Sequence, residues 1–491
     1  MPQYTLPISP SPDISAACQR FVADVGEWTR ACIQRYADAP PTNVHDQATY
    51  TSGWEPYLRA TGDEDVLAFL TDVRDGLRDH FTAGGQWRHG YWAMQEAHHG
   101  TEHFEIFLGF LQRILPGDPA TGRQLNDVAE HMGNWSADVP GWFDWERRRF
   151  HSLFFGADGV GTEPGMGINS PDHLRCVNIC LLAEGGSTRR ARHKEEAPVQ
   201  PSQPTPPHSR EGTGSTPPPL WGRLGGGAQL QEEEREEERQ RYLNFATLYA
   251  GEWANAILAE ERLPLALTPE SILYEFDGEN EAVYRSFMGE VSGLQSGVDR
   301  AENFLGSDAI NTFLRLWKET GQTRFRAATE RLLDLLVTQL TDPDAGAAAA
   351  GVRAYRRWTG GSRYDESVRA ALAGLEPFAA EMLTLDTDFR LDHRPSGVGK
   401  RSDMPRWLED GRPRRHNPIT LLVAAEINGD EALAVRAVDL ARTHFLLARQ
   451  TFPAGREHGC AARTVSAIAR GHGRENHAGM TTAVLQPALG W

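Results

Sequence analysis

Thr61-Gly62-Asp63 joins two helical runs, and the same kind of joint returns at Thr320-Gly321-Gln322 and Thr359-Gly360-Gly361. A glycine can take the positive φ that ends one helix, and the polar residue after it begins the next. So short a joint makes the two helices antiparallel. The sequence therefore predicts a series of helical hairpins.

Three looser joints extend the series. Gly117-Asp118 and Gly429-Asp430 each follow an apolar helical run, and Glu184-Gly185-Gly186 ends the apolar run 177–183. Apart from one low-complexity stretch, the intervals are about 40 to 70 residues, which is long for tetratricopeptide or ankyrin repeats. Long, irregular hairpins favour a closed ring, which needs no polar capping repeats. Strand patterns are scarce, since the run 150–155 is short, so the predicted fold class is all-α.

The composition allows a large folded core and disfavours nucleic acid as a partner. Of the 491 residues, 40% are hydrophobic and 24% are charged, as in ordinary globular proteins. The formal net charge of −17 opposes binding to phosphate backbones and to anionic lipid. We therefore expect no nucleic-acid partner and no membrane partner.

The cysteines and the first residues indicate a cytoplasmic protein. The five cysteines are few, odd in number and without CxxC spacing, which disfavours a disulfide framework or a cysteine zinc site. The first residues have neither the basic region nor the apolar region of a secretory signal. No stretch of sequence approaches the roughly 20 apolar residues that span a bilayer.

One segment interrupts the repeat. Residues 187–240 are in turn basic, proline-rich, glycine-rich and rich in Glu, Gln and Arg. Such a segment cannot bury enough apolar surface to offset its ordering entropy, so it predicts a disordered insertion that could end in a short exposed helix. We expect residues 1–186 and 241–491 to be two parts of one helical unit, with the insertion at a hairpin joint.

The first helix of each hairpin begins at a polar cap, and in a ring of equivalent hairpins these N-termini would point to one face. The residues that would meet there are Trp54, His98, His99, Glu102, His103, Asn169, Asp172, His173, Asn311, Arg415, His416 and Asn417. Acidic residues in a first helical turn and Asn at an N-cap are favoured locally without any function. Histidine has no such preference, so the five histidines indicate a site that handles protons, metals or ligands.

Two aromatic loops follow second helices of the hairpins. One contains Trp142-Phe143-Asp144-Trp145-Glu146, and the other contains Tyr274-Glu275-Phe276-Asp277. Flat aromatic faces beside carboxylates suit a sugar site, in which a carboxyl pair can cleave a glycosidic bond. Packing between hairpins is the alternative explanation for these aromatic residues.

The C-terminal segment is also dense in polar side chains. Arg474, Asn476 and His477 lie in a glycine-rich stretch, residues 455–477. Glycine makes the backbone pliable where side chains can bind, which predicts a ligand-contacting loop. A basic, frayed chain end is the alternative.

His99-Gly100-Thr101-Glu102-His103 matches the pattern H-x-x-E-H and over these five residues resembles the inverted zincin peptidases. On one helix, His99 and His103 could bind zinc while Glu102 polarises a water molecule. The pattern is short for a chain with 17 histidines, and Gly100-Thr101 looks like a helix start, which would take His99 out of helical spacing. A zinc-dependent hydrolase is therefore an alternative to an enzyme without a cofactor.

The hairpin series, the tryptophan and carboxylate loops and the polar face together resemble an (α/α)6 toroid of the six-hairpin glycosidase type. The resemblance covers most of the chain and is one of architecture. It implies a carbohydrate enzyme whose cleft lies at the end of the inner helices. Such toroids include glycoside hydrolases, unsaturated-uronyl hydrolases, sugar epimerases and polysaccharide lyases. Toroid lyases often carry a β-sandwich, and no such region is visible in the sequence, which favours a glycoside hydrolase that acts on an oligosaccharide or polysaccharide.

The resemblance implies roles for particular residues. In a hydrolase, Asp144 and either Glu102 or Asp277 would be the general acid and base. The substrate-contacting residues would be Trp54, His98, Trp142, Trp145, Asn169, Tyr274, His416, Asn417, Arg474, Asn476 and His477.

Two other functions remain open at this point. In a uronate-directed lyase or an epimerase, His99, His173 or Tyr274 would abstract a proton, while Arg474 and Asn476 would neutralise the uronate carboxylate. A helical-repeat scaffold that binds a protein or glycan without chemistry would also account for the hairpins and the acidic surface.

Overall fold

The computed structural model describes residues 3–36, 51, 53–163, 166–185, 225–275, 278, 297–341, 346–373, 381–386, 406–413, 417–450 and 484–490. The described chain is mostly helical, so the prediction of an all-α fold is confirmed. Within these residues, no helix combines the length and the apolar character that a membrane span requires.

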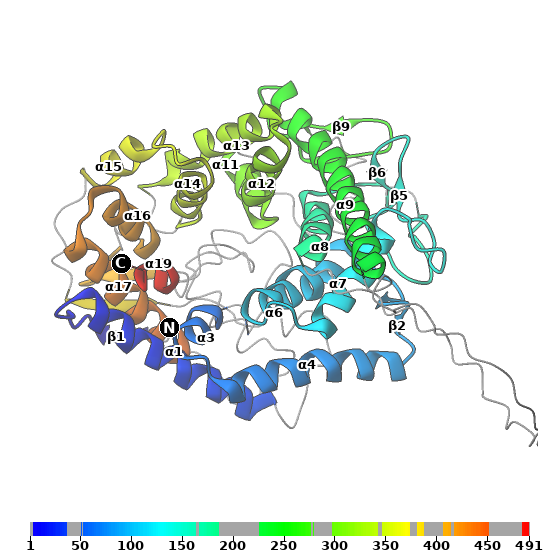
Figure 1. Cartoon of the computed structure of the whole chain (residues 1–491). Coiled ribbons are helices and arrows are strands. Elements are labelled where there is room, and N and C mark those ends of the chain that lie inside the picture. The colour runs from blue at the N-terminus through cyan, green and yellow to red at the C-terminus, as the bar shows by residue number, and fades with distance from the viewer. Residues whose placement is uncertain are drawn as a thin grey trace, which may run out of the picture.

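Helical hairpins follow one another along the chain (Figure 1). The pairs are α3 (Glu55–Thr61) with α4 (Glu64–Ala83), α6 (Gly109–Ile114) with α7 (Pro119–Met132), α8 (Leu174–Gly185) with α9 (Gly225–Ala259), α12 (Ala309–Thr320) with α13 (Thr323–Leu336), α14 (Gly346–Thr359) with α15 (Asp365–Ala373), and α16 (Pro418–Asn428) with α17 (Glu431–Gln450).

The glycine joints behave as the sequence predicts. The φ angles of Gly62, Gly117, Gly321, Gly360 and Gly429 are 63°, 87°, 70°, 67° and 66°. At four of these joints the glycine amide donates to a carbonyl oxygen in the last turn of the preceding helix. This is the C-cap that a residue in the left-handed conformation makes at the end of an α-helix. These φ angles confirm the predicted joints at the five positions. The joints could be predicted because each depends only on local backbone chemistry. At the sixth, α8 ends at Gly185 and Gly186 lies outside the described residues.

Neighbouring hairpins pack against each other through their first helices. Helix α8 contacts α12, α12 contacts α14, and α14 contacts α16. The last hairpin returns to the start of the chain, where α17 lies against α1 (Ile14–Tyr36) (Figure 1). Ion pairs cross this contact, with Arg442 Nε 2.5 Å from Asp24 Oδ2 and Arg449 Nη1 3.4 Å from Glu27 Oε2. The first and last helices are therefore joined by apolar packing and by charge.

A small sheet joins segments that are far apart in the sequence. Strand β1 (Gln3–Pro7) pairs with β10 (Met382–Asp386), which pairs with β11 (Arg406–Glu409) and then β12 (Arg412–Pro413), all antiparallel. Further two-residue strands form four antiparallel pairs: β2 (Trp87–Arg88) with β3 (Tyr91–Trp92), β4 (Gln95–Glu96) with β7 (Phe154–Phe155), β5 (Phe143–Asp144) with β6 (Arg149–Phe150), and β8 (Ala266–Leu267) with β9 (Ile272–Leu273). Sequence patterns missed the two-residue strands because each is too short to show alternation.

Helix α9 begins inside the segment that the sequence predicts to be an insertion. It starts at Gly225 and continues without a break past residue 241, where the repeat was expected to resume. Residues 187–224 of the predicted insertion lie outside the described residues. The helical part of the segment is therefore an N-terminal extension of the second helix of a hairpin.

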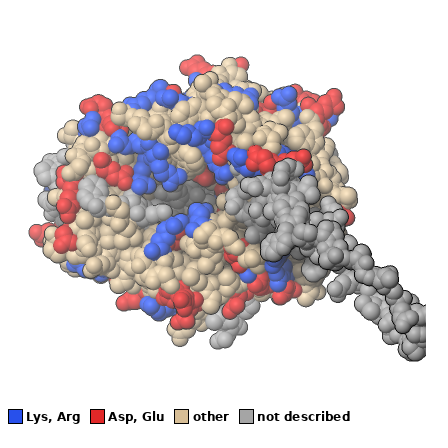
Figure 2. All heavy atoms as spheres, viewed as in Figure 1, with Lys and Arg blue, Asp and Glu red and all other residues tan. Residues whose placement is uncertain are grey.

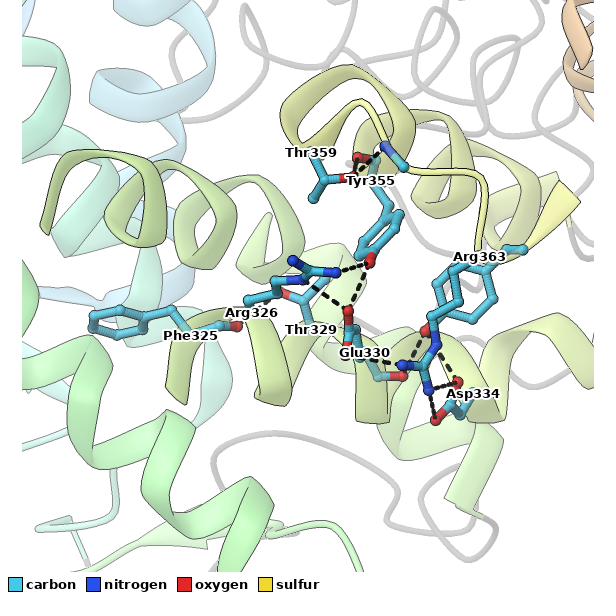
Figure 3. Close-up of polar contacts among 10 residues, drawn as sticks. Phe325, Arg326, Thr329, Glu330, Asp334, Tyr355, Thr359 and Arg363 are labelled. Atoms are coloured by element: carbon cyan, nitrogen blue, oxygen red, sulfur yellow. Dashed lines mark hydrogen bonds and ion pairs between the residues drawn. The ribbon is translucent and has the colours of Figure 1, made fainter. Parts of the chain in front are cut away.

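A charged network joins α13 to α14 and to the turn before α15 (Figure 3). Glu330 accepts hydrogen bonds from Tyr355 Oη at 2.6 Å, Arg326 Nε at 2.9 Å and Arg363 Nη1 at 3.0 Å. Arg363 also contacts Asp334. Burial acts to raise the pKa of Glu330, but these donors outweigh burial and hold the pKa below its ordinary value of 4.5.

We predict that Glu330→Gln lowers the free energy of unfolding by about 1 kcal/mol at neutral pH. Because the folded-state pKa of Glu330 is depressed, its contribution is complete above the unfolded-state pKa of 4.5 and is lost as pH falls through the lower folded-state pKa. Denaturant titrations of wild type and variant should therefore converge on acidification. Glu366→Gln removes a carboxylate that is 83% exposed and should have no effect at either pH.

Candidate functional site

The chain forms a π-helix where the sequence shows the zincin-like pattern. Helix α5 (Ala97–Thr101) passes into the π-helix η1 (Glu102–Leu108), which then passes into α6. Segments of π-helix are rare and occur frequently at functional sites. This one carries Glu102 and His103, which are buried, and Glu105, whose side chain is 12% exposed.

A buried arginine from the start of α8 binds this π-helix. Arg175, whose side chain is 2% exposed, places Nη1 3.3 Å from Glu105 Oε2 and Nε 3.6 Å from Asp172 Oδ1. Its Nη2 donates to the carbonyl oxygen of Gly306 at 3.2 Å. Asn178, one turn further along α8, donates to Glu105 Oε1 at 3.0 Å. One guanidinium therefore bridges two carboxyl groups and the segment that leads into α12.

The start of α12 completes the arrangement. Ser307 Oγ donates to Asp172 Oδ1 at 3.2 Å. Asp308 occupies the N-cap position of α12 with a φ of 57°, a conformation that costs energy for a residue other than glycine and is found preferentially at functional sites. Asn311 Nδ2 donates to Asp308 Oδ1 at 2.7 Å, and Trp358 Nε1, from the end of α14, donates to Asn311 Oδ1 at 3.0 Å.

We call this set the Arg175 cluster. Its members come from η1, from the start of α8, from α12 and from α14, and they are Glu105, Asp172, Arg175, Asn178, Ser307, Asp308, Asn311 and Trp358.

Burial dominates the electrostatics of the cluster. It raises the pKa of Glu105 to about 7, against the opposing effects of Arg175 and Asn178, and the negative charge of Asp308 raises it further. Burial also raises the pKa of Asp308, although Asn311 and nearby arginines act in the opposite direction. Glu105 is therefore a carboxyl group that can hold or release a proton near neutral pH, as a general acid or base must.

The predicted meeting of helix N-termini occurs in part. Asp172 and Asn311 both belong to the Arg175 cluster. His173 and Asn169 are fully buried beside it: His173 contacts the backbone of Ser170 and Ser152, and its pKa is lowered by burial to about 4. The Asn169 amide bonds both the N–H and the carbonyl of Phe150 and accepts from Tyr249 Oη. Both side chains therefore stabilise the local fold through hydrogen bonds to the backbone.

The two histidines of the zincin-like pattern lie in different surroundings. His103 is fully buried among the rings of Trp87, Trp92 and Phe104, and burial lowers its pKa to about 4. His99 is half-buried, with Nδ1 3.6 Å from Glu96 Oε2. The part of the chain that the structure describes contains no group of three or more His, Cys, Asp or Glu residues placed to hold a metal ion.

The aromatic loop around Asp144 folds into a tight turn between β5 and β6. Asp144 accepts from the backbone N–H groups of Glu146 and Arg147 and pairs with the Arg147 guanidinium at 2.8 Å, and these donors lower its pKa. Trp142 is fully buried, with Nε1 donating to the Gly156 carbonyl at 3.0 Å. Trp145 is 41% exposed, and its Nε1 donates to the Gly133 carbonyl.

The remaining predicted residues are spread over the fold. Trp54 is fully buried at the start of α3, near the ring of Phe69. Tyr274 Oη donates to the Ala256 carbonyl at 2.8 Å, and Asn417 caps α16 by accepting from Ile419 N–H at 2.9 Å. His98 lies in α5. The other predicted residues lie outside the described part of the chain: Asp277, Arg415, His416, Arg474, Asn476 and His477.

Sequence reasoning missed four of the most informative members of the cluster, namely Glu105, Arg175, Asn178 and Asp308. One signal was present. Arg175 and Asn178 are polar residues in an otherwise apolar run, 174–183, and an arginine on a buried helix is rare unless it is paired. Glu105 carried no such signal, because its place next to Arg175 depends on two helices meeting.

Searches with family models, with curated proteins and with solved structures found no match to this chain.

Proposed function

We propose that the hairpins form an (α/α)6 toroid and that the protein is a glycoside hydrolase with the Arg175 cluster as its active site. The order of the hairpins, the contacts between their first helices and the contact of α17 with α1 support the toroid. The observation that carries the function is that two carboxyl groups, those of Glu105 and Asp172, contact the one buried guanidinium of Arg175, and burial raises the pKa of Glu105 to about 7. Such a pairing is what glycosidic-bond cleavage uses.

In the proposed mechanism, Glu105 is the general acid. A carboxyl group whose pKa is about 7 is substantially protonated at neutral pH, so Glu105 can give its proton to the oxygen of the leaving sugar as the glycosidic bond breaks. Asp308 assists by repulsion, since its negative charge raises the pKa of Glu105. Arg175 and Asn178 hold the Glu105 side chain in its position.

Asp172 is the second catalytic carboxyl group in this proposal. Its carboxylate accepts a hydrogen bond from Ser307 Oγ and contacts Arg175. Because Glu105 and Asp172 contact one guanidinium, their separation stays within the upper limit of about 9.5 Å that applies to glycosidases. Asp172 would activate water or attack the sugar carbon, according to their exact separation.

The histidines offer less support for the lyase or epimerase alternative. A general base for proton abstraction needs a nitrogen that is open to the substrate. Both ring nitrogens of His173 contact backbone groups, and the Tyr274 hydroxyl donates to the Ala256 carbonyl. His99 is half-buried beside Glu96, so it is the remaining candidate base of this alternative.

Glu105→Gln tests the proposal. The side-chain amide keeps the shape of Glu105 but has no acidic proton, so the rate of saccharide hydrolysis is expected to fall by a factor of about 10² to 10⁴. The measurement is release of reducing ends from a panel of neutral and acidic oligosaccharides, with thermal unfolding to show that the variant is folded.

Glu319→Gln is the matched control, since Glu319 pairs with Arg315 on the surface of α12. It should hydrolyse the same saccharides at the wild-type rate. The proposal fails if the wild-type protein hydrolyses none of the panel, or if Glu105→Gln retains wild-type turnover.

A further inference from the structure

Arginines gather around a hollow on one face of a strongly acidic protein. The formal net charge is −17, yet Figure 2 shows basic side chains on opposite sides of a hollow near the middle of the face. The same view in Figure 1 has α14 on one side and α3 with α6 on the other. These helices each have arginine in the last turn: Arg59 in α3, Arg113 in α6, and Arg356 and Arg357 in α14.

Basic residues at helix C-termini are favoured by the helix dipole, so the last-turn arginines need no function by themselves. Three of them contact acidic partners: Arg356 pairs with Asp365, and Arg59 and Arg113 share Glu55. The inference rests on Arg357 and Arg113, whose charges both act on Asp308 of the cluster, and on what lies beside them.

Arg357 adjoins the Arg175 cluster. It is exposed, and its Cζ lies 5.7 Å from the ring centre of its neighbour Trp358. Trp358 is half-buried and donates to Asn311, which in turn bonds Asp308. An aromatic ring and an exposed cation thus stand next to the carboxyl groups of the candidate site.

Arg113, in the last turn of α6, is a second partly exposed cation. Its side chain is 48% exposed, and it shares the single carboxylate of Glu55 with Arg59, at 3.0 Å and 2.8 Å. One negative charge therefore faces two positive ones. The charges of both Arg113 and Arg357 act to lower the pKa of Asp308, as expected of cations near the cluster.

We propose that this hollow binds a saccharide that carries a carboxylate or sulfate group, with a sugar ring against Trp358 and the anionic group held by Arg357 and Arg113. The inference rests on the proposed function and adds the class of substrate. The flat apolar face of a sugar packs on tryptophan. The guanidinium fork matches planar carboxylate and also binds sulfate oxygens through several donors. A neutral sugar would offer no opposite charge to Arg357 and would leave Arg113 and Arg59 to share the one carboxylate of Glu55.

Binding of matched probe pairs tests the inference. The probes are tetragalacturonate and its carboxyl-reduced form, and a sulfated carrageenan tetrasaccharide and its desulfated form, titrated by calorimetry into Glu105→Gln so that turnover does not interfere. The anionic member of at least one pair should bind about tenfold more tightly than its neutral form and weaken as salt is added. The pair that shows the difference distinguishes carboxylate from sulfate.

The decisive variant is Arg357→Gln, added to the Glu105→Gln background. It should weaken binding of the preferred anionic probe about tenfold and leave its neutral form unchanged. Arg369→Gln, which alters an exposed arginine of α15 that contacts Asn428, is the control and should change neither.

Each failure points to a different conclusion. Equal binding of anionic and neutral forms, or an unchanged affinity in Arg357→Gln, overturns the inference and leaves the hydrolase proposal standing. Selective binding of an anionic probe by a protein whose wild type cleaves no saccharide overturns the hydrolase proposal and leaves the binding site. No binding of any probe counts against both.

Discussion

Replacing Arg175 by methionine is expected to lower the free energy of unfolding by about 3 to 5 kcal/mol, which is the usual cost of removing one partner of a buried ion pair. Methionine fills a similar volume but has no charge and no donor. Glu105, Asp172 and the Gly306 carbonyl would then lose the guanidinium that joins them. The measurement is denaturant unfolding at neutral pH.

A second variant isolates the cause of this effect. Adding Asp172→Asn to Arg175→Met removes a carboxyl group that has lost the guanidinium and should recover part of the lost stability, which a double-mutant cycle would show as coupling. Arg78→Met, at a position on α4 that is 38% exposed, should cost little. An Arg175→Met protein as stable as wild type would contradict the view that this arginine holds the cluster together.

Trp142→Ala is expected to lower the free energy of unfolding by about 3 to 5 kcal/mol, because it removes a large side chain from a packed core. The ring of Trp142 is fully buried, with ring centres 4.6 Å from Tyr91, 4.8 Å from Phe155 and 5.3 Å from His131. Its Nε1 hydrogen bond to Gly156 is lost as well. Thermal and denaturant unfolding measure the loss.

The comparison with Trp145→Ala separates packing from substrate contact. Trp145 is 41% exposed, so its removal should cost far less stability than removal of Trp142. If Trp142 were instead a wall of a sugar subsite, Trp142→Ala would bind saccharide more weakly and unfold like wild type. That result would show that Trp142 contacts the substrate, as the sequence predicted.

The hairpin joints were predictable because their chemistry is local. A positive φ at Gly62, Gly321 or Gly429 and the polar residue that follows are properties of four or five neighbouring residues. The N-cap of Asn417 before Pro418 was predictable for the same reason. The sheet of β1, β10, β11 and β12 was not, because its strands come from opposite ends of the chain and are held by pairing across that distance.

The candidate site was predictable only as a neighbourhood. The expectation that helix starts converge led to Asp172 and Asn311, but it also led to His173 and Asn169, which bond their own local backbone. Helix starts attract the same polar residues for capping and for function, so residue type alone does not separate the two. The burial of a side chain and the identity of its hydrogen-bond partner do distinguish a capping residue from a functional one.

The sequence by itself determined the helical hairpins, their order and the acidic character of the protein, since these follow from periodicity, joints and composition. Only the tertiary structure decided that Glu105, Asp172 and Asp308 meet around Arg175, and that Trp142 and His103 are core residues. The physical reason is that the pKa of a carboxyl group and the exposure of a ring depend on which distant side chains surround them. In this protein those surroundings come from helices that lie far apart in the chain.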